Sequence, residues 1–314
     1  MTAGRFYFIA PMPRLADAAS WAAQLRRIED LGFHAVAVSE HYSRGWAMDA
    51  LTAMNFALGQ TTRLHALPLV LNNDLHHPAM LAKAIATADV LSAGRAALGI
   101  GAGWLQDDYR ALGLRYQPGP ARLERLEEAL RVLTAFFRDD QVNFHGRHYQ
   151  VTGLEALPKP ARRPRPPLLV GGGGPKMLGL AARYADIAGI HMRLGPGPFD
   201  QAAAGELTRD GVERKIELVA AAAAAAGRPA PELQFTCYDV SITGSGRPPS
   251  GSSFAAYISA HPAAFARSPA SLRGEAAQCA DDLRRWNEEL GISYWNLGGD
   301  LEALAPVIAR LSAE

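Results

Sequence analysis

The chain has 314 residues, of which 48% are hydrophobic and 20% charged, and its 32 basic and 31 acidic side chains give a formal net charge of +1. This balance argues against a nucleic-acid partner, which a strongly basic surface would indicate. Every apolar run is shorter than the ~20 residues of a membrane span, and the first residues lack the features of a signal peptide. We therefore expect a cytoplasmic protein with neither a membrane nor a nucleic-acid partner.

Short apolar runs alternate with longer segments of helical periodicity, a pattern typical of parallel strands joined by helices. The predicted strands span 5–10, 35–39, 64–71, 96–100, 168–170, 187–190, 233–240 and 294–297. The predicted helices span 17–31, 49–59, 78–91, 121–137, 176–184, 208–226, 275–290 and 301–311. Eight such pairs favour an α/β fold of the (β/α)8 TIM-barrel type. The alternative, an open doubly wound sheet, would place its glycine-rich turn after the first strand, where none is found.

Two insertions are expected, after the fourth strand over 102–120 and after the seventh strand over 241–274. The segment 142–151 predicts a small hairpin outside the barrel repeat, because its residues alternate around His145-Gly146. A stretch rich in Gly, Ser and Pro over 243–253 predicts a mobile surface loop. Cys237 and Cys279 are too few for a disulfide framework and are expected to be core thiols.

Active-site residues of such barrels lie where the strands end. His41 follows the second strand and is the strongest single candidate, because an imidazole exchanges protons near neutral pH; a structural hydrogen-bonding role is the alternative. Glu40 either orients that ring or ends the strand. Asp107-Asp108 is one local acidic pair, and no group of His, Cys, Asp or Glu has metal-ligand spacing, so no metal is expected.

Four consecutive glycines, Gly171 to Gly174, connect a predicted strand to a helix. Glycine lets the backbone approach a ligand closely, and the amides and dipole of the following helix favour an anion by ~0.3–2 kcal/mol. A phosphate is the natural ligand, although a flexible turn would also use glycine. Lys176 and Arg122 can add positive charge, while Arg122 could instead pair with Glu124 or Glu127.

Two tryptophans, Trp46 and Trp104, lie on predicted mouth loops. Their indole rings could stack against a planar cofactor or substrate. They could equally be buried under the insertions.

The chain resembles the bacterial luciferase-like superfamily of flavin and deazaflavin oxidoreductases over nearly its whole length. The motifs that carry the resemblance are Leu31-Gly32-Phe33 with Ser39-Glu40-His41-Tyr42, His77-Pro78-Ala79, Leu91-Ser92-Ala93-Gly94-Arg95, Leu98-Gly99-Ile100-Gly101-Ala102-Gly103-Trp104, Arg122-Leu123-Glu124 with Glu127-Glu128-Ala129-Leu130, Pro166-Pro167-Leu168-Leu169-Val170 with the four glycines, and Ala181-Ala182-Arg183-Tyr184-Ala185-Asp186. The glycine quartet and Asn72-Asn73-Asp74 are most similar to actinobacterial members assigned as coenzyme F420-dependent oxidoreductases.

The resemblance implies one barrel domain over 1–314, commonly dimeric, with a flavin or 5-deazaflavin across the barrel mouth. The ring would lie against a bulge with a cis non-proline peptide, which maps near Leu69 and Val70. The implied cofactor-binding residues are Glu40, Leu69, Val70, Asn72, Gly101, Ala102, Gly103, Arg122, Gly171, Gly172, Gly173, Gly174, Lys176 and Met177.

The same resemblance places His41 and Trp46 beside the reactive carbon of the cofactor. Trp46 is one residue away from the position of the tryptophan in the family motif. Some deazaflavin dehydrogenases have an acid directly after the glycines of the fourth strand, where this chain has Trp104. That departure argues against a sugar-phosphate dehydrogenase. Asp108 is the nearest carboxylate that could donate a proton instead.

The first hypothesis is therefore an oxidoreductase that uses coenzyme F420 to transfer hydride to a small organic molecule with a C=C, C=N or C=O bond. One alternative is a monooxygenase that uses reduced FMN and O2, supplied by a separate cofactor reductase. A second is a flavin-binding relative without catalytic activity. The substrate depends on the loops over 104–120 and 241–274, where no motif defines a pocket.

Overall fold

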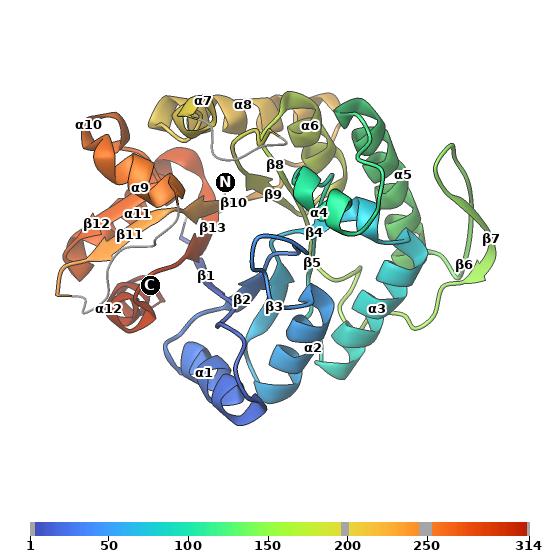
Figure 1. The fold of residues 1–314 in the computed structure, drawn as a ribbon, viewed down its shortest axis with the longest axis horizontal. Coiled ribbons are helices and arrows are strands. Elements are labelled where there is room, and N and C mark those ends of the chain that lie inside the picture. Colours follow the sequence, from blue (N-terminus) through green and yellow to red (C-terminus); the bar gives the residue numbers. More distant parts are fainter. Residues whose placement is uncertain (1–3, 196–200, 245–252, 313–314) are drawn as a thin grey trace.

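The computed structural model describes residues 4–195, 201–244 and 253–312 (Figure 1). Nine parallel strands form the main sheet in the order β3-β2-β1-β13-β10-β9-β8-β5-β4. Their bounds are β1 Tyr7–Pro11, β2 Ala35–Val38, β3 His65–Pro68, β4 Leu71–Asn72, β5 Leu98–Gly101, β8 Leu168–Gly172, β9 Ile187–Ile190, β10 Glu232–Cys237 and β13 Ile292–Leu297. The predicted (β/α)8 barrel is confirmed.

The helices lie around this sheet (Figure 1). Their bounds are α1 Ala18–Asp30, α2 Ala50–Gln60, α3 Pro78–Leu91, α4 Gln106–Ala111, α5 Gly119–Arg138, α6 Pro175–Tyr184, α7 Gln201–Gly205, α8 Arg209–Ala225, α9 Ser253–Ala260, α10 Pro262–Phe265, α11 Ala276–Leu290 and α12 Leu301–Ser312, with a short 3-10 turn, η1, at Asn73–Leu75. Several begin where the sequence has a capping side chain: Asp17 accepts from Ser20 N at 3.0 Å, and Asp49 accepts from Thr52 N at 2.8 Å. No helix in the described ranges is long and apolar enough to cross a membrane.

Two short strands, β3 and β4, together occupy the position of the third barrel strand, which we call the third stave. β3 pairs with β2 and β4 pairs with β5, while a bridge between Ala66 and Ala96 connects the two sides and nearly closes the barrel. The prediction of one continuous strand over 64–71 is therefore wrong. The chain is interrupted at Leu69–Val70, whose peptide bond is cis, as the family resemblance led us to expect. The Ser39 hydroxyl holds the interruption by donating to the Leu69 carbonyl at 2.8 Å.

The barrel interior is packed mainly by small and aliphatic side chains. Its buried cluster comprises Ile9, Ala35, Ala37, Leu67, Ala97, Leu169 and Ile187. A larger cluster packs the outer faces of the strands against the helices. The interior is therefore filled below its mouth, and a ligand can enter only at the carboxyl ends of the strands.

Two groups of elements lie outside the barrel repeat, on opposite sides in Figure 1. The antiparallel hairpin of β6 Gln141–His145 and β7 Gln150–Glu155 follows α5, in agreement with the hairpin predicted over 142–151. On the other side, β11 Asp239–Ile242 pairs with β12 Ser271–Gly274, and α9 and α10 lie between them in the chain.

The strand predicted over 233–240 is wrong at its end. β10 stops at Cys237, and the chain then leaves the barrel to pair with β12. The reason is Asp239, which is fully buried and accepts from Arg273 Nε on β12 at 2.6 Å. Cys237 and Cys279 are both buried free thiols. Residues 245–252 of the loop predicted to be mobile lie outside the described residues.

Candidate active site

The carboxyl ends of the barrel strands line a cavity of about 630 Å³. Every predicted site residue lies on its wall except two, Lys176 and Trp46. Lys176 is exposed on the first turn of α6, and Trp46 is 48% exposed. The cavity is therefore built from β2, β4, β5 and β8, as expected, and also from β9, β10 and β13.

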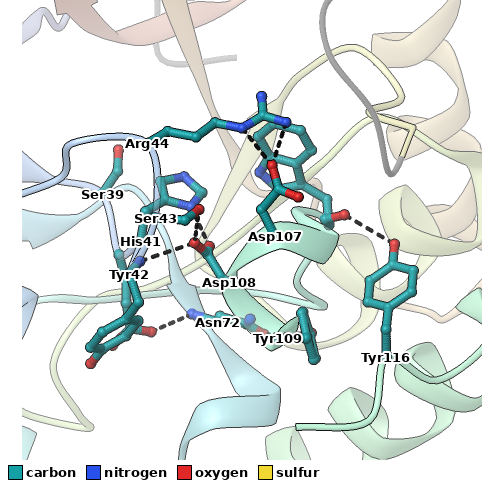
Figure 2. A network of polar contacts seen from close by, with 12 residues as sticks. Ser39, His41, Tyr42, Ser43, Arg44, Asn72, Asp107, Asp108, Tyr109 and Tyr116 are labelled. Carbon is teal, nitrogen blue, oxygen red and sulfur yellow. Dashed lines mark hydrogen bonds and ion pairs between the residues drawn. The ribbon is translucent and has the colours of Figure 1, made fainter. Parts of the chain in front are cut away.

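His41 is the central polar group on the β2 side of the cavity (Figure 2). Its Nδ1 lies 2.7 Å from Oδ2 of Asp108, which belongs to α4 and is almost fully buried. The other carboxylate oxygen of Asp108 accepts from Tyr42 N at 3.0 Å and from the Ser43 hydroxyl at 2.6 Å. Because Nδ1 is engaged by Asp108, Nε2 is the ring nitrogen left for a ligand.

Asp108 is held as a carboxylate. Burial alone raises the pKa of this group, but the hydrogen bonds from Ser43, His41 and the Tyr42 backbone outweigh that effect and lower its pKa below the usual range. An aspartate in this state accepts hydrogen bonds and stabilises a positive imidazole. The geometry thus favours Asp108 as a partner of His41 over the role of direct proton donor.

Two indole rings surround His41. The Trp46 ring lies 5.0 Å from the His41 ring in a tilted arrangement, and the Trp104 ring lies 5.9 Å away, nearly perpendicular. Only Trp104 reaches the cavity wall. Trp46 therefore lies next to His41 but off the cavity wall, and Trp104 lies beside the space that a ligand would fill.

Glu40 is buried and is bound by two groups that the sequence did not bring together. His76 Nε2 lies 2.8 and 3.0 Å from its two oxygens, and the backbone N–H of Asn72 donates to it at 2.8 Å. Asn72 is the last residue of β4, the second of the two strands of the third stave. Glu40 thus fixes the position of the backbone at β4, and its partner His76 was not among the predicted site residues.

The four glycines serve different purposes. A Cβ on Gly172 would lie 2.4 Å from Met177 Cγ, and one on Gly173 would lie 2.2 Å from the Met192 carbonyl carbon. Both glycines are therefore required by the packing of the chain itself. At Gly174, the N-cap of α6, a Cβ would make only ordinary contacts, the nearest at 3.7 Å. The N-terminus of α6 is open there.

A buried lysine reinforces this turn from outside. Lys215 on α8 donates from Nζ to the Gly173 carbonyl at 2.6 Å and to Glu206 at 2.7 Å. Arg193 also binds Glu206, with its Nε 2.7 Å from the carboxylate. The lysine thus fixes the orientation of the Gly173 carbonyl.

Gly103 has a φ of +72°, and neighbouring groups lie too close to it to leave space for a side chain. A Cβ there would lie 2.2 Å from the Tyr109 hydroxyl and 2.3 Å from Asn72 Oδ1. The Gly103 carbonyl accepts from Arg122, which also donates to the Gln117 carbonyl at 3.0 Å. Arg122 therefore supports the cavity wall.

The alternative partners considered for Arg122 are engaged elsewhere. Glu124 binds Arg147, and Glu127 binds Arg183 and Arg131. The guanidinium of Arg122 instead lies over the Tyr116 ring, 4.3 Å from its centroid.

The far wall of the cavity carries polar residues that the sequence did not identify as site residues. His191 follows β9, Tyr238 follows β10, and Thr236 and Asn296 lie in β10 and β13. Their positions at strand ends were visible in the sequence, but their side-chain directions were not. Within the described ranges, no group of three or more His, Cys, Asp or Glu side chains is placed to hold a metal ion.

The cavity fits a planar ring system with an anionic tail. Its wall at Leu69, Val70 and Gly101 is apolar or lacks side chains. At its edge, Leu178 N–H is bonded to Gly174 O at 2.9 Å, and the preceding N–H groups of Lys176 and Met177 have no partner within the helix. These amides, with the helix dipole, suit a phosphate.

Comparison with known proteins agrees with this arrangement. The model of the luciferase-like monooxygenase family matches residues 6–294. An F420-dependent glucose-6-phosphate dehydrogenase from Amycolatopsis mediterranei is 30% identical over 207 residues, 61% of this chain and 62% of the relative. An FMNH2-dependent dimethylsulfone monooxygenase from Pseudomonas putida is 29% identical over 162 residues, 50% of this chain and 44% of the relative. The matches thus span only about half to three fifths of these relatives.

Solved structures share the fold over the whole chain. An F420-dependent secondary alcohol dehydrogenase, in complex with an F420-acetone adduct, superposes with a TM-score of 0.76 at 18% identity and covers 99% of both chains. The EDTA monooxygenase of Chelativorans sp. BNC1 gives a TM-score of 0.75 at 16% identity, over 98% of this chain and 94% of the other. With the match of the family model over residues 6–294, the chain belongs to the luciferase-like monooxygenase family.

Proposed function

We propose that the protein is a coenzyme F420-dependent oxidoreductase that transfers hydride between the deazaflavin and a small organic molecule with a C=C, C=N or C=O bond. The observation that carries this proposal is the imidazole of His41, held at the mouth by the buried carboxylate of Asp108 with Nδ1 to Oδ2 at 2.7 Å. When bound, the deazaflavin supplies the hydride chemistry, and the protein supplies position and charge.

The residues of the β4, β5 and β8 walls would hold this cofactor. Leu69 and Val70 would support one face of the ring, and the backbone at Gly101 and Gly103 would lie beside it. The N-terminus of α6, with Gly174 as its N-cap, would receive the phosphate. Lys176, exposed on the first turn, and Arg122, on the cavity wall, add positive charge near the anionic tail.

His41 would act on the proton of the reaction. When a carbonyl carbon receives hydride from the bound cofactor, the protonated imidazole would donate its Nε2 proton to the carbonyl oxygen and become neutral, giving an alcohol. Asp108 stabilises the protonated ring and fixes its orientation through Nδ1. Trp104 closes one side of the space next to the ring. In the opposite direction, the neutral imidazole accepts the hydroxyl proton.

Parallel titration of the purified protein with F420 and FMN tests the cofactor. We expect saturable binding of F420, read from deazaflavin fluorescence, with a lower dissociation constant than for FMN. Tighter binding of FMN would contradict the choice of cofactor.

The FMNH2-dependent relative favours a second candidate, a monooxygenase supplied by a separate flavin reductase. A deazaflavin lacks the nitrogen that supports oxygen-adduct chemistry, so the two candidates differ in their use of O2. Substrate-dependent O2 consumption with chemically reduced FMN would decide for the monooxygenase. Tight cofactor binding without turnover across a broad panel of substrates would decide for a cofactor-binding protein without catalytic activity.

A further inference from the structure

The wall formed by β9, β10 and β13 has a polar centre that the proposed chemistry does not use. If β3 and β4 are counted as one position, three strand positions separate β2 from β9 in either direction around the barrel. His41, which follows β2, and His191, which follows β9, therefore enter the cavity from opposite sides. Thr236 of β10 and Asn296 of β13 are paired in register between them. All of these residues line the same cavity.

One acceptor on this wall is unsatisfied. Asn296 donates from Nδ2 to the Thr236 hydroxyl oxygen at 3.3 Å, which leaves Oδ1 as the remaining polar atom of the amide. Asn296 Oδ1 is buried and has no hydrogen-bond partner among the described residues. A buried acceptor without a donor is costly by about 1–3 kcal/mol, so this oxygen is suited to a ligand with an O–H or N–H group.

The neighbouring hydroxyl, that of Thr236, can act as a hydrogen-bond donor to a ligand. Thr236 Oγ1 accepts from Asn296 and from Gln234 Nε2, each at 3.3 Å. With two N–H groups directed at its oxygen, the Thr236 hydroxyl has its own proton to donate. Thr236 and Asn296 together therefore present one donor and one acceptor, the pattern that a single hydroxyl group satisfies.

His191 and Tyr238 make the adjacent part of the wall neutral. His191 Nδ1 donates to the Met192 carbonyl at 3.1 Å, and Nε2 accepts from the Tyr238 hydroxyl in a short hydrogen bond. Burial lowers the pKa of His191 and raises that of Tyr238, which supports the neutral form of both. With its proton used in this way, the Tyr238 oxygen acts toward a ligand only as an acceptor.

The cations nearest this wall are already bound. Arg193 is paired with Glu206, and Lys215 with Glu206 and the Gly173 carbonyl. Within the part of the chain that the structure describes, the β9–β10–β13 wall thus offers hydrogen bonds without an unpaired positive charge. This favours an uncharged substrate over a phosphorylated one.

We propose that Thr236 and Asn296 form a subsite that binds a hydroxyl group of an uncharged substrate, with Asn296 Oδ1 as acceptor and the Thr236 hydroxyl as donor. The proposal deepens the proposed function, on which it rests for the identity of the reaction. The hydroxyl is bound on β10 and β13, whereas proton transfer is assigned to His41 on β2. The subsite therefore selects the substrate, and His41 acts in its conversion.

Three probes of similar shape test the subsite: 2-phenyl-2-propanol donates and accepts, acetophenone only accepts, and tert-butylbenzene does neither. The tertiary alcohol has no hydrogen on its carbinol carbon, so oxidised cofactor cannot convert it. Dissociation constants are measured by ligand-observed NMR, with the protein both free of cofactor and loaded with oxidised F420. For the wild-type protein we expect the alcohol to bind most tightly, about tenfold better than tert-butylbenzene, with acetophenone between them.

Variants separate the two hydrogen bonds. Asn296→Ala should lower affinity for the alcohol several-fold and leave acetophenone nearly unchanged, whereas Thr236→Val should weaken both. Ser293→Ala is the matched control, because Ser293 lies in the same strand and its buried hydroxyl also lacks a partner among the described residues, but it does not line the cavity. If Asn296→Ala does not fold, Thr236→Val, which keeps the side-chain shape, provides the test.

Equal affinities of the three probes for the wild-type protein would overturn the subsite, as would a full preference for the alcohol in both variants. If the cofactor-bound protein bound phenyl phosphate more tightly than the alcohol, the inference that the substrate is uncharged would be wrong. These results are distinct from failure of the proposed function. If neither F420 nor FMN binds, the proposed function fails, while the order of the probes on the cofactor-free protein still decides the subsite.

Discussion

The two ends of the barrel use histidine in opposite ways. At the carboxyl ends of the strands, His41 and His76 each contact a buried carboxylate, from Asp108 and Glu40 respectively. At the amino ends, His34 and His65 stack on each other with ring centroids 4.4 Å apart.

The pair at the amino ends is held neutral. Burial lowers the pKa of His34 to about 4 and that of His65 to about 3, and the nearby positive charge of Arg162 adds to both shifts. One end thus pairs histidines with carboxylates, and the other uses imidazole as an uncharged ring. The role of each histidine therefore follows from the groups that surround it.

The largest effect is expected from His41→Ala, which removes the group assigned to proton transfer. Turnover, measured as oxidation of reduced F420 by the best acceptor from a panel of enones, imines and ketones, should fall by about 10²- to 10⁴-fold. Affinity for F420 should change little, because the phosphate and ring contacts remain. His145→Ala, on the exposed hairpin, is the control and should retain wild-type turnover. Full activity of His41→Ala would refute the assignment.

A smaller loss is expected from Asp108→Asn, which keeps the shape but removes the charge beside His41. Turnover should decrease by about 10- to 100-fold, because the protonated imidazole loses its carboxylate. Asp107→Asn is the matched control on the same helix, since Asp107 binds Arg44 and Arg110 near the surface. Equal losses in the two variants would show that the charge of Asp108 has no special role.

Asp108→Asn also has a thermodynamic consequence at low pH. The folded-state pKa of Asp108 lies below its ordinary value, so its contribution to stability is complete above about pH 4 and is lost as the pH falls through the folded-state pKa. Acid titration of the free energy of unfolding should therefore show a weaker decline for Asp108→Asn than for the wild-type protein. An identical decline would contradict the lowered pKa.

The histidines at the amino ends give a different pH dependence. Their folded-state pKa values lie below 6.5, so from pH 6.5 down to about 4 the unfolded chain takes up protons that the folded chain does not. Stability should fall in this range by up to about 1.4 kcal/mol per pH unit for each proton. His65→Phe keeps an aromatic ring and should reduce the slope, measured by denaturant unfolding at several pH values. An unchanged slope would mean that His65 is protonated in the folded protein.

The smallest effect concerns the glycine turn at the mouth. Gly174→Ala adds only ordinary contacts and should leave the melting temperature nearly unchanged, while F420 affinity weakens a few-fold because the methyl group partly covers the N-terminus of α6. Gly173→Ala is the contrasting variant. Its methyl group would clash with the Met192 backbone, and the protein should be destabilised by about 1–3 kcal/mol. Equal behaviour of the two variants would contradict this division.

Sequence patterns predicted the barrel because hydrophobic periodicity depends on burial, and each strand and helix buries one face or both. The end of the seventh strand was mispredicted for a definite reason. The predicted strand extended to Val240, but the burial of Asp239 with Arg273 directs the chain into a separate sheet, and no local pattern reports that pairing.

Within the site, His41 and the glycines were predictable from strand ends and family motifs. The contacts of Asp108, Glu40 and His76 were not, because each joins residues more than 30 positions apart. The polar pair of Thr236 and Asn296 was also missed, since strand residues of mixed polarity do not reveal which side faces the cavity.

The crystal structure of the complex with F420 tests the central claim most directly. The account predicts the phosphate at the N-terminus of α6 beside Gly174, and the deazaflavin ring against Leu69 and Val70 with its reactive carbon facing His41. A cofactor whose tail lies elsewhere, or whose reactive carbon faces away from His41, would contradict it.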